Sequence, residues 1–269
     1  MKRTELIFQI GNLSVLYEDE SISWPNAEFT SKTNFPAELK IWEDEVEPEQ
    51  IMESWKKLSE RCESFLIAMK YMGNRQIICA NGDHPTYYYE DNNFTPRNET
   101  EVQILIQYLR GEISSFAVSS ATLPALQVSG SMTISPSQLP QTMPFIPLCL
   151  RRIAATITLV DELANYPDQQ LKLAYMVLEE LVKDQHVQDF KDIRNARNFV
   201  SHVFCEDQKV LELVRMSLPS AINPSGTSAK FDREKSDHLS FAATFASKAH
   251  QWAKNEFEDE VVRHGGCIS

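Results

Sequence analysis

The sequence predicts an α+β N-terminal domain followed by an all-α antiparallel helical bundle. Apolar and polar residues alternate near the start of the chain, as they do in half-buried strands. From residue 147 onward apolar residues recur at helical spacing and strand patterns vanish. Between these patterns, residues 135–144 hold three prolines among polar residues, which is typical of an interdomain linker. We therefore expect domains at 1–134 and 145–263.

The composition is that of a soluble globular protein whose charge is negative and unevenly spread. The chain has 269 residues, 42% hydrophobic and 24% charged, with a formal net charge of −12. Residues 1–150 carry 11 Lys and Arg against 20 Asp and Glu, and residues 151–269 carry 15 against 18. A uniformly basic nucleic-acid-binding surface is therefore excluded, and phosphate binding would need a local cluster of cations.

Cysteine spacing and hydropathy indicate the compartment. The five cysteines, at 62, 79, 149, 205 and 267, form no C-x-x-C pair and resemble neither a disulfide framework nor a zinc site. We expect a cytoplasmic protein without a metal or a cofactor. The first residues form only a short apolar run, unlike a signal peptide, and no run reaches the length of a membrane span. We therefore expect no contact with a membrane.

The N-terminal domain is predicted to mix short strands with two helices. Leu6, Phe8 and Ile10 alternate with Glu5, Ile7 and Gln9, as expected of a strand. Strands are predicted within 5–17, 20–42, 76–80, 87–89 and 113–134, and helices over 48–72 and 99–109. We interpret the acidic run at 43–49 as a solvated helix start, because carboxylates favour the positive end of a helix dipole.

The C-terminal domain is predicted to be entirely helical. Apolar stripes predict helices over 147–166, 168–184, 187–204, 206–217 and 237–262. The connections between most of these helices are short, which favours antiparallel neighbours in a bundle. Residues 219–237 are rich in Pro, Ser and Gly, and we expect a mobile loop there.

The helix predicted over 187–204 also carries a cluster of polar groups. Its predicted core-facing residues are Ile193, Ala196, Phe199, Val200, Val203 and Phe204. The opposite face carries Arg194, Asn195, Asn198, Ser201 and His202. Asn198 and His202 are neighbours one turn apart, and Arg197 lies at the border of the two faces. This rim is the candidate functional site of the chain.

The helical half resembles the HEPN (higher eukaryotes and prokaryotes nucleotide-binding) domain family. The family is marked by an Arg followed, after four to six residues, by a His, often with a polar residue directly after the Arg. Here that pattern is Arg197-Asn198-Phe199-Val200-Ser201-His202. The resemblance implies a helical bundle that dimerises and joins two motifs into one metal-independent RNA-cleaving site. Arg197 and His202 match the defining positions and Asn198 the intervening polar one, while the N-terminal half lies outside the resemblance.

The chemistry of these side chains suits RNA cleavage without a metal. The reaction needs a base for the 2′-hydroxyl proton, a cation for the phosphorane charge and a proton for the leaving oxygen. Histidine serves as base or acid near neutral pH, and an arginine fork suits a phosphate. One chain offers a single histidine at this rim, so two-fold pairing would supply the second proton-transfer group.

Each candidate residue also has a structural explanation. His202 can be an ordinary histidine at a helix end, where the dipole favours a cation. Arg194 and Arg197 can pair with nearby carboxylates, namely Asp189, Asp192, Glu179 or Glu180, and this is the expected fate of Arg194. Arg194 and Ser201 are therefore supporting candidates. The histidines at 186, 238, 250 and 264 have no partners at metal-ligand spacing.

Three functions follow from this pattern. The first is a dimeric metal-independent endoribonuclease acting on RNA, of the toxin or antiviral defence type, with an N-terminal domain that senses a signal or binds a regulatory partner. The second is a non-catalytic scaffold that uses the bundle for dimerisation, which the net charge of −12 favours. The third is a nucleotide-binding module that recognises phosphate through Arg197 and Asn198.

Overall fold

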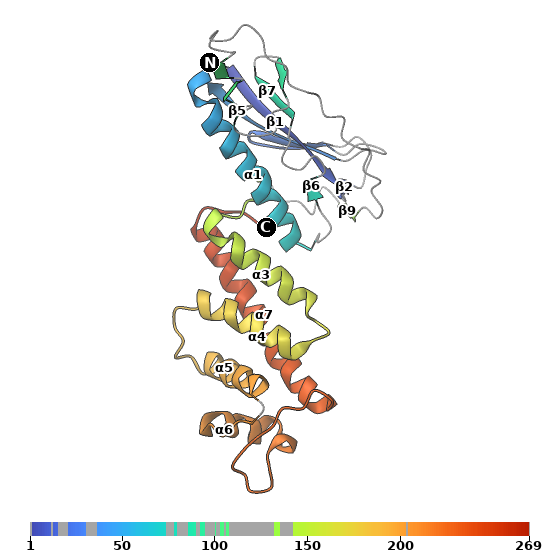
Figure 1. Cartoon of the computed structure of the whole chain (residues 1–269), viewed down its shortest axis with the longest axis vertical. Helices are drawn as coiled ribbons and strands as arrows, with labels where there is room; N and C mark the ends of the chain where they lie inside the picture. The colour runs from blue at the N-terminus through green and yellow to red at the C-terminus, as the bar shows by residue number, and fades with distance from the viewer. Residues whose placement is uncertain are drawn as a thin grey trace. The chain divides into compact units, whose positions relative to one another are not determined.

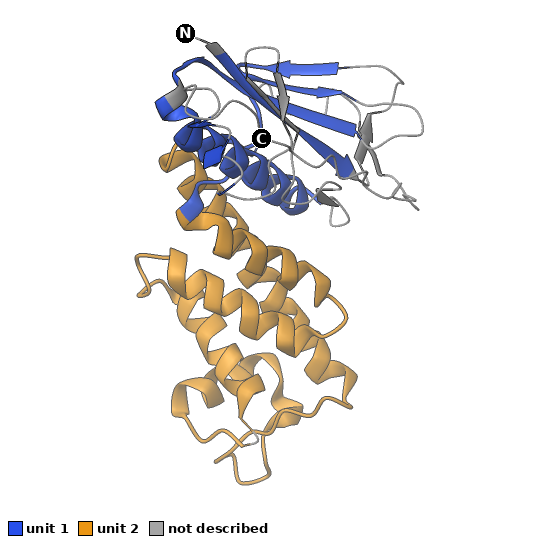
Figure 2. Cartoon of the chain, turned by 45° about the horizontal axis from the view of Figure 1, so that its top comes forward, with its two compact units in different colours: residues 1–148, 266–269 blue, residues 149–265 orange. Residues whose placement is uncertain are grey.

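The computed structural model divides the chain into two compact units (Figure 2). Unit 1 comprises residues 1–148 and 266–269, and unit 2 comprises residues 149–265. The structure describes residues 2–11, 13–15, 21–30, 37–73, 78–79, 86–89, 92–94, 100, 103–104, 106–107, 132–134, 142–202 and 204–268.

Unit 1 is built on an antiparallel sheet whose central strand is β1 (Lys2–Gly11). The strand order is β3-β4-β5-β1-β7-β8, and β6 also pairs with β1. The other strands of this sheet are β3 (Ser21–Trp24), β4 (Ala27–Thr30), β5 (Ala37–Val46), β6 (Ile78–Cys79), β7 (Thr86–Tyr89) and β8 (Asn92–Phe94). A separate parallel pair joins β2 (Leu13–Val15) to β9 (Met132–Ile134).

The helix α1 (Ile51–Tyr71) packs on one face of this sheet, against β1 and β5 (Figure 1). The predicted alternation in β1 is confirmed, because Leu6, Phe8 and Ile10 are buried and the residues between them are only half-buried. The apolar stripe of α1 meets these side chains in one core. The predicted helix over 99–109 is described at residues 100, 103–104 and 106–107, which are helical. Residues 113–131, with a predicted strand, lie outside the described residues.

The predicted linker at 135–144 is described only from Thr142 onward, and there it belongs to unit 1. Ser64 Oγ donates to the backbone oxygen of Ile146 and accepts from its N–H, both at 2.7 Å. Phe145 and Cys267 pair as an antiparallel bridge. These contacts fasten both the end of the linker and the end of the chain to unit 1.

Unit 2 is helical, as predicted from residue 147 onward. It contains α3 (Arg151–Glu162), α4 (Pro167–Leu181), α5 (Gln188–Ser201), α6 (Gln208–Ser217) and α7 (Ser236–Arg263), with short 3-10 turns η3 (Leu148–Leu150) at its start and η4 (Pro219–Ala221) after α6. The long helix α7 packs against α3, α4 and α5, and α5 also contacts α4 and α6 (Figure 1). No helix in the part of the chain that the structure describes could cross a membrane.

Two predictions for unit 2 need correction. The helix predicted over 187–204 ends at Ser201, because His202 has extended backbone angles (φ −110°, ψ 142°). Phe204, predicted to face the core, is instead 63% exposed, and Val203 lies outside the described residues. The loop predicted as mobile is tied by hydrogen bonds, since the side-chain oxygen of Asn223 accepts from the N–H groups of Thr227 and Ser228.

Candidate functional site

The predicted site lies at the C-terminal end of α5. Phe199 and Val200 are buried and hold this turn against the core of unit 2. Arg197 and Asn198, on the same turn, are half-buried, and His202 is exposed as the C-cap. The amphipathic pattern therefore extends through the motif, and the helix ends at His202.

The guanidinium of Arg197 stacks on the aromatic ring of Tyr175 from α4, with 4.4 Å between its Cζ and the ring centroid. The phenol of Tyr175 donates to Glu179 Oε1 at 2.9 Å. Burial raises the pKa of Tyr175, Glu179 raises it further, and the nearby Arg197 opposes the shift. The attraction between the cation and the face of the ring restrains the position of the guanidinium. Arg197 is thus preorganised by its neighbour on α4.

Most other polar side chains of the rim make no polar contacts with the residues that the structure describes. Among the described residues, no hydrogen bond or ion pair links the side chains of Arg194, Asn198, Ser201 or His202 to another group. These side chains are half-buried or exposed. A rim of this kind is available to a ligand, or to a second copy of the chain.

The carboxylates that were expected to pair with the arginines have other partners. Asp189 binds Lys248 at 2.7 Å, and Asp192 accepts from Gln188 at 2.7 Å. On α4, Glu180 binds Arg152 at 2.7 Å and Glu179 accepts from Tyr175. The expected pairing of Arg194 with a nearby carboxylate is therefore wrong for the residues that the structure describes.

The position of His202 fits both interpretations of this residue. It is the C-cap of α5, a helix-end position that suits an ordinary structural histidine. The ring is also exposed, as a group that transfers a proton to or from RNA must be.

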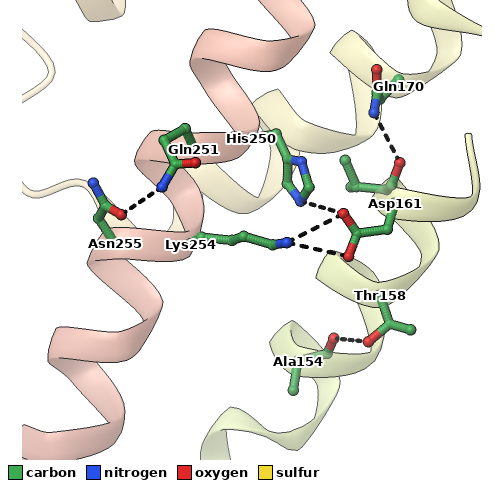
Figure 3. Close-up of polar contacts among 9 residues, drawn as sticks. Ala154, Thr158, Asp161, Gln170, His250, Gln251, Lys254 and Asn255 are labelled. Carbon is green, nitrogen blue, oxygen red and sulfur yellow. Dashed lines mark hydrogen bonds and ion pairs between the residues drawn. The ribbon is translucent and has the colours of Figure 1, made fainter. Parts of the chain in front are cut away.

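A second cluster of charged side chains, which the sequence did not suggest, joins α3 to α7 (Figure 3). His250 Nε2 lies 3.3 Å from Asp161 Oδ1, and Lys254 Nζ lies 3.3 Å from both carboxylate oxygens. The side chain of His250 is only 13% exposed. His250 and Lys254 are i,i+4 neighbours, a spacing visible in the sequence, but Asp161 joins them only through the packing of two helices. The cluster stabilises that packing.

Two hollows lie away from the rim. In unit 1, a hollow of about 280 Å³ is lined by the acidic run at 43–45 and the start of α1, where Lys57 pairs with Glu43 and Glu53. In unit 2, one of about 270 Å³ lies between the end of α4 and Trp252 of α7. Neither includes Arg197 or His202. Within the described ranges, no group of three or more His, Cys, Asp or Glu side chains could hold a metal ion.

We compared the chain with family models, with curated proteins and with solved structures, and none of them matches. The resemblance to the HEPN domain therefore depends on the motif of Arg197, Asn198 and His202 and on its place in a helical unit. A function for the chain has to be argued from its own geometry.

Proposed function

We propose that the chain is a metal-independent endoribonuclease of the HEPN type that acts as a dimer. Arg197 and His202 are its catalytic residues, and Asn198, Arg194 and Ser201 support them. One observation carries the proposal: a stacked arginine, a histidine and further unpaired polar side chains gather at one end of α5. Surface cations normally find a carboxylate when one is near, and here the nearby carboxylates are bound elsewhere.

The proposed reaction is an in-line displacement at phosphorus. His202 of one protomer removes the proton from the 2′-hydroxyl, whose oxygen then attacks the adjacent phosphorus. Arg197 stabilises the charge that develops on the phosphorane oxygens. The bond from phosphorus to the 5′-oxygen breaks, and that oxygen takes a proton from the second histidine of the dimer. The products are a 2′,3′-cyclic phosphate and a 5′-hydroxyl.

The dimer also offsets the repulsion between the acidic chain and RNA. The chain carries a net charge of −12, which opposes the approach of RNA. Two rims placed together double the local positive charge and supply the second proton-transfer group. In this proposal the enzyme acts in the cytoplasm in defence against viruses or as a toxin. Unit 1 binds the regulatory partner or signal that controls it.

Cleavage of total RNA by the full-length chain in the presence of a chelator tests the proposal. His202→Ala and Arg197→Ala are expected to reduce the rate by at least about 100-fold. His186→Ala, at an exposed histidine preceding α5, is the matched control and should retain the wild-type rate. The proposal fails if the wild-type chain cleaves no RNA, or if His202→Ala and His186→Ala cleave equally well.

A second candidate function is a non-catalytic dimerising scaffold or nucleotide-binding protein. The observation that favours it is the stacking of Arg197 on Tyr175, which also explains this arginine as a purely structural residue. In that case Arg197→Ala lowers the thermal stability of unit 2 or abolishes saturable nucleotide binding, and no cleavage is seen at any RNA concentration. Sedimentation of the same variants shows whether the rim is needed for the dimer.

A further inference from the structure

Phe204 is a large aromatic side chain that lies exposed beside the candidate site. It is 63% exposed, although phenylalanine belongs to the residue types most often buried. It follows His202 by two residues, so their Cα atoms are at most about 7 Å apart. Phe204 lies beyond the end of α5, since His202 already has extended backbone angles. An aromatic face is therefore presented to solvent next to the motif.

The backbone around Phe204 is held in place. Cys205 is buried and pairs with Ala229 through two backbone hydrogen bonds of 2.9 Å. The residue after Ala229 is Lys230, whose Nζ lies 5.8 Å from the centroid of the Phe204 ring. Two segments far apart in the sequence thus combine to place a cation over one face of an exposed aromatic ring.

We propose that Phe204 and Lys230 form a platform for single-stranded RNA, on which a base stacks on the ring while the ammonium group binds an adjacent phosphate. The inference rests on the proposed function and names the form of RNA that the site takes. Proteins that bind single strands combine stacking aromatics with backbone-tracking cations in this way. A base in a duplex is covered by its neighbours on both faces, so the platform selects unpaired RNA.

The surrounding charges set how strongly the platform depends on salt. Glu206 is exposed close to Phe204 and repels a phosphate. Asp207 is less repulsive because its carboxylate caps α6, accepting from the N–H groups of Lys209 and Val210. Lys230 is the cation that the structure places over the ring. Its removal is therefore expected to weaken binding and to reduce the salt dependence.

The test measures the affinity of a labelled single-stranded RNA for the full-length chain carrying His202→Ala, which keeps the RNA intact. Adding Phe204→Ala should weaken binding about 5- to 150-fold, the range for losing one stacked base, and Phe204→Trp should preserve it. Lys230→Gln should reduce the slope of log affinity against log salt by about 0.7. Met216→Ala, at another exposed apolar residue (79%), is the matched control and should bind like its parent.

The outcomes separate the platform from the nuclease. Binding that depends on Phe204 in a protein whose wild type never cleaves supports the platform and overturns the enzyme. Cleavage that depends on His202, together with no effect of Phe204→Ala on RNA binding, supports the enzyme and overturns the platform. The platform is also overturned if the parent binds no RNA, if it prefers a duplex, or if Phe204→Ala dissociates a dimer without changing RNA affinity, which would make Phe204 a contact between two copies.

Discussion

Acidification is predicted to destabilise unit 2 through one histidine of α7. His238 is fully buried, at 0% exposure. Its Nδ1 accepts from the backbone N–H of Asp232 at 3.0 Å, so the neutral ring carries its proton on Nε2. Nε2 is buried without a hydrogen-bond partner among the described residues. The ring lies 6.4 Å from the ring of Phe199 and 5.9 Å from that of Phe231, between centroids. Charging this ring would place a cation in an aromatic core.

The sign and the size of the effect follow from proton linkage. Burial lowers the pKa of His238, Asp237 partly offsets the shift, and Lys235 adds to it. His238 also lies in the first turn of α7, where the helix dipole opposes a positive charge. In the unfolded chain its pKa is about 6.5, so unfolding below that pH takes up a proton. The stabilisation of unit 2 by the neutral ring is complete above the pKa of the unfolded state and is lost as the pH falls. The free energy of unfolding decreases for this reason by at most about 1.4 kcal/mol between pH 7.5 and pH 5.5.

Urea unfolding followed by helical circular dichroism at several pH values measures this effect. In His238→Asn the side-chain amide oxygen can still accept from the backbone N–H of Asp232, but position 238 no longer carries a titratable group. The variant is less stable overall, and its free energy of unfolding should fall less than that of the wild type between pH 7.5 and pH 5.5. His186→Asn, at an exposed histidine, should retain the wild-type pH dependence. Equal pH dependence of the wild type and His238→Asn would refute the reasoning.

Three further substitutions test contacts within each unit. Tyr175→Phe keeps the ring under the arginine but removes the hydrogen bond to Glu179, so thermal unfolding should show a loss of about 1 kcal/mol. Ser64→Ala leaves the backbone groups of Ile146 without their buried partner and should cost about 1–3 kcal/mol, with faster hydrogen exchange at Ile146. Asp207→Ala removes the N-cap of α6 and should cost about 1 kcal/mol in urea unfolding, whereas Asp207→Asn should cost little.

Much of the fold was predictable because its signals are local. The alternation of Leu6, Phe8 and Ile10 depends only on the geometry of a strand, and all three are buried in β1. The helices of unit 2 follow apolar stripes whose spacing depends only on the geometry of a helix. For this reason α7, predicted over 237–262, is observed as Ser236–Arg263.

The end of α5 was not predictable from local pattern. The apolar spacing continues through Val203 and Phe204, and neither Gly nor Pro follows to stop the helix. Beyond the helix, Cys205 pairs with Ala229 as an antiparallel bridge. That pairing joins residues distant in sequence, so no window around α5 contains it. The exposure of Phe204, and the platform inferred from it, became visible only in three dimensions.

The environment of the candidate site was predictable only in part. Tyr175 belongs to the buried stripe of α4, a helix that the apolar spacing predicts. Its stacking under Arg197 depends on the rotation of α4 relative to α5, which neither helix encodes alone. The same holds for Asp161, which meets His250 through the packing of α3 against α7. In both cases the sequence predicted the helix that carries each residue. It did not predict which residue of another helix would pack against it.

Two carboxylates close to the arginines of α5 are bound by cations from other helices. Lys248 binds Asp189 on α5 itself, and Arg152 binds Glu180 on the neighbouring helix. Each of these pairs neutralises a carboxylate that an arginine of the rim would otherwise attract. Two of the carboxylates near Arg194 and Arg197 are therefore neutralised by cations, within a chain whose net charge is −12. Because these carboxylates pair with cations of other helices, the arginines of the rim remain outside ion pairs with the described residues. A phosphate would bind them without first displacing an ion pair.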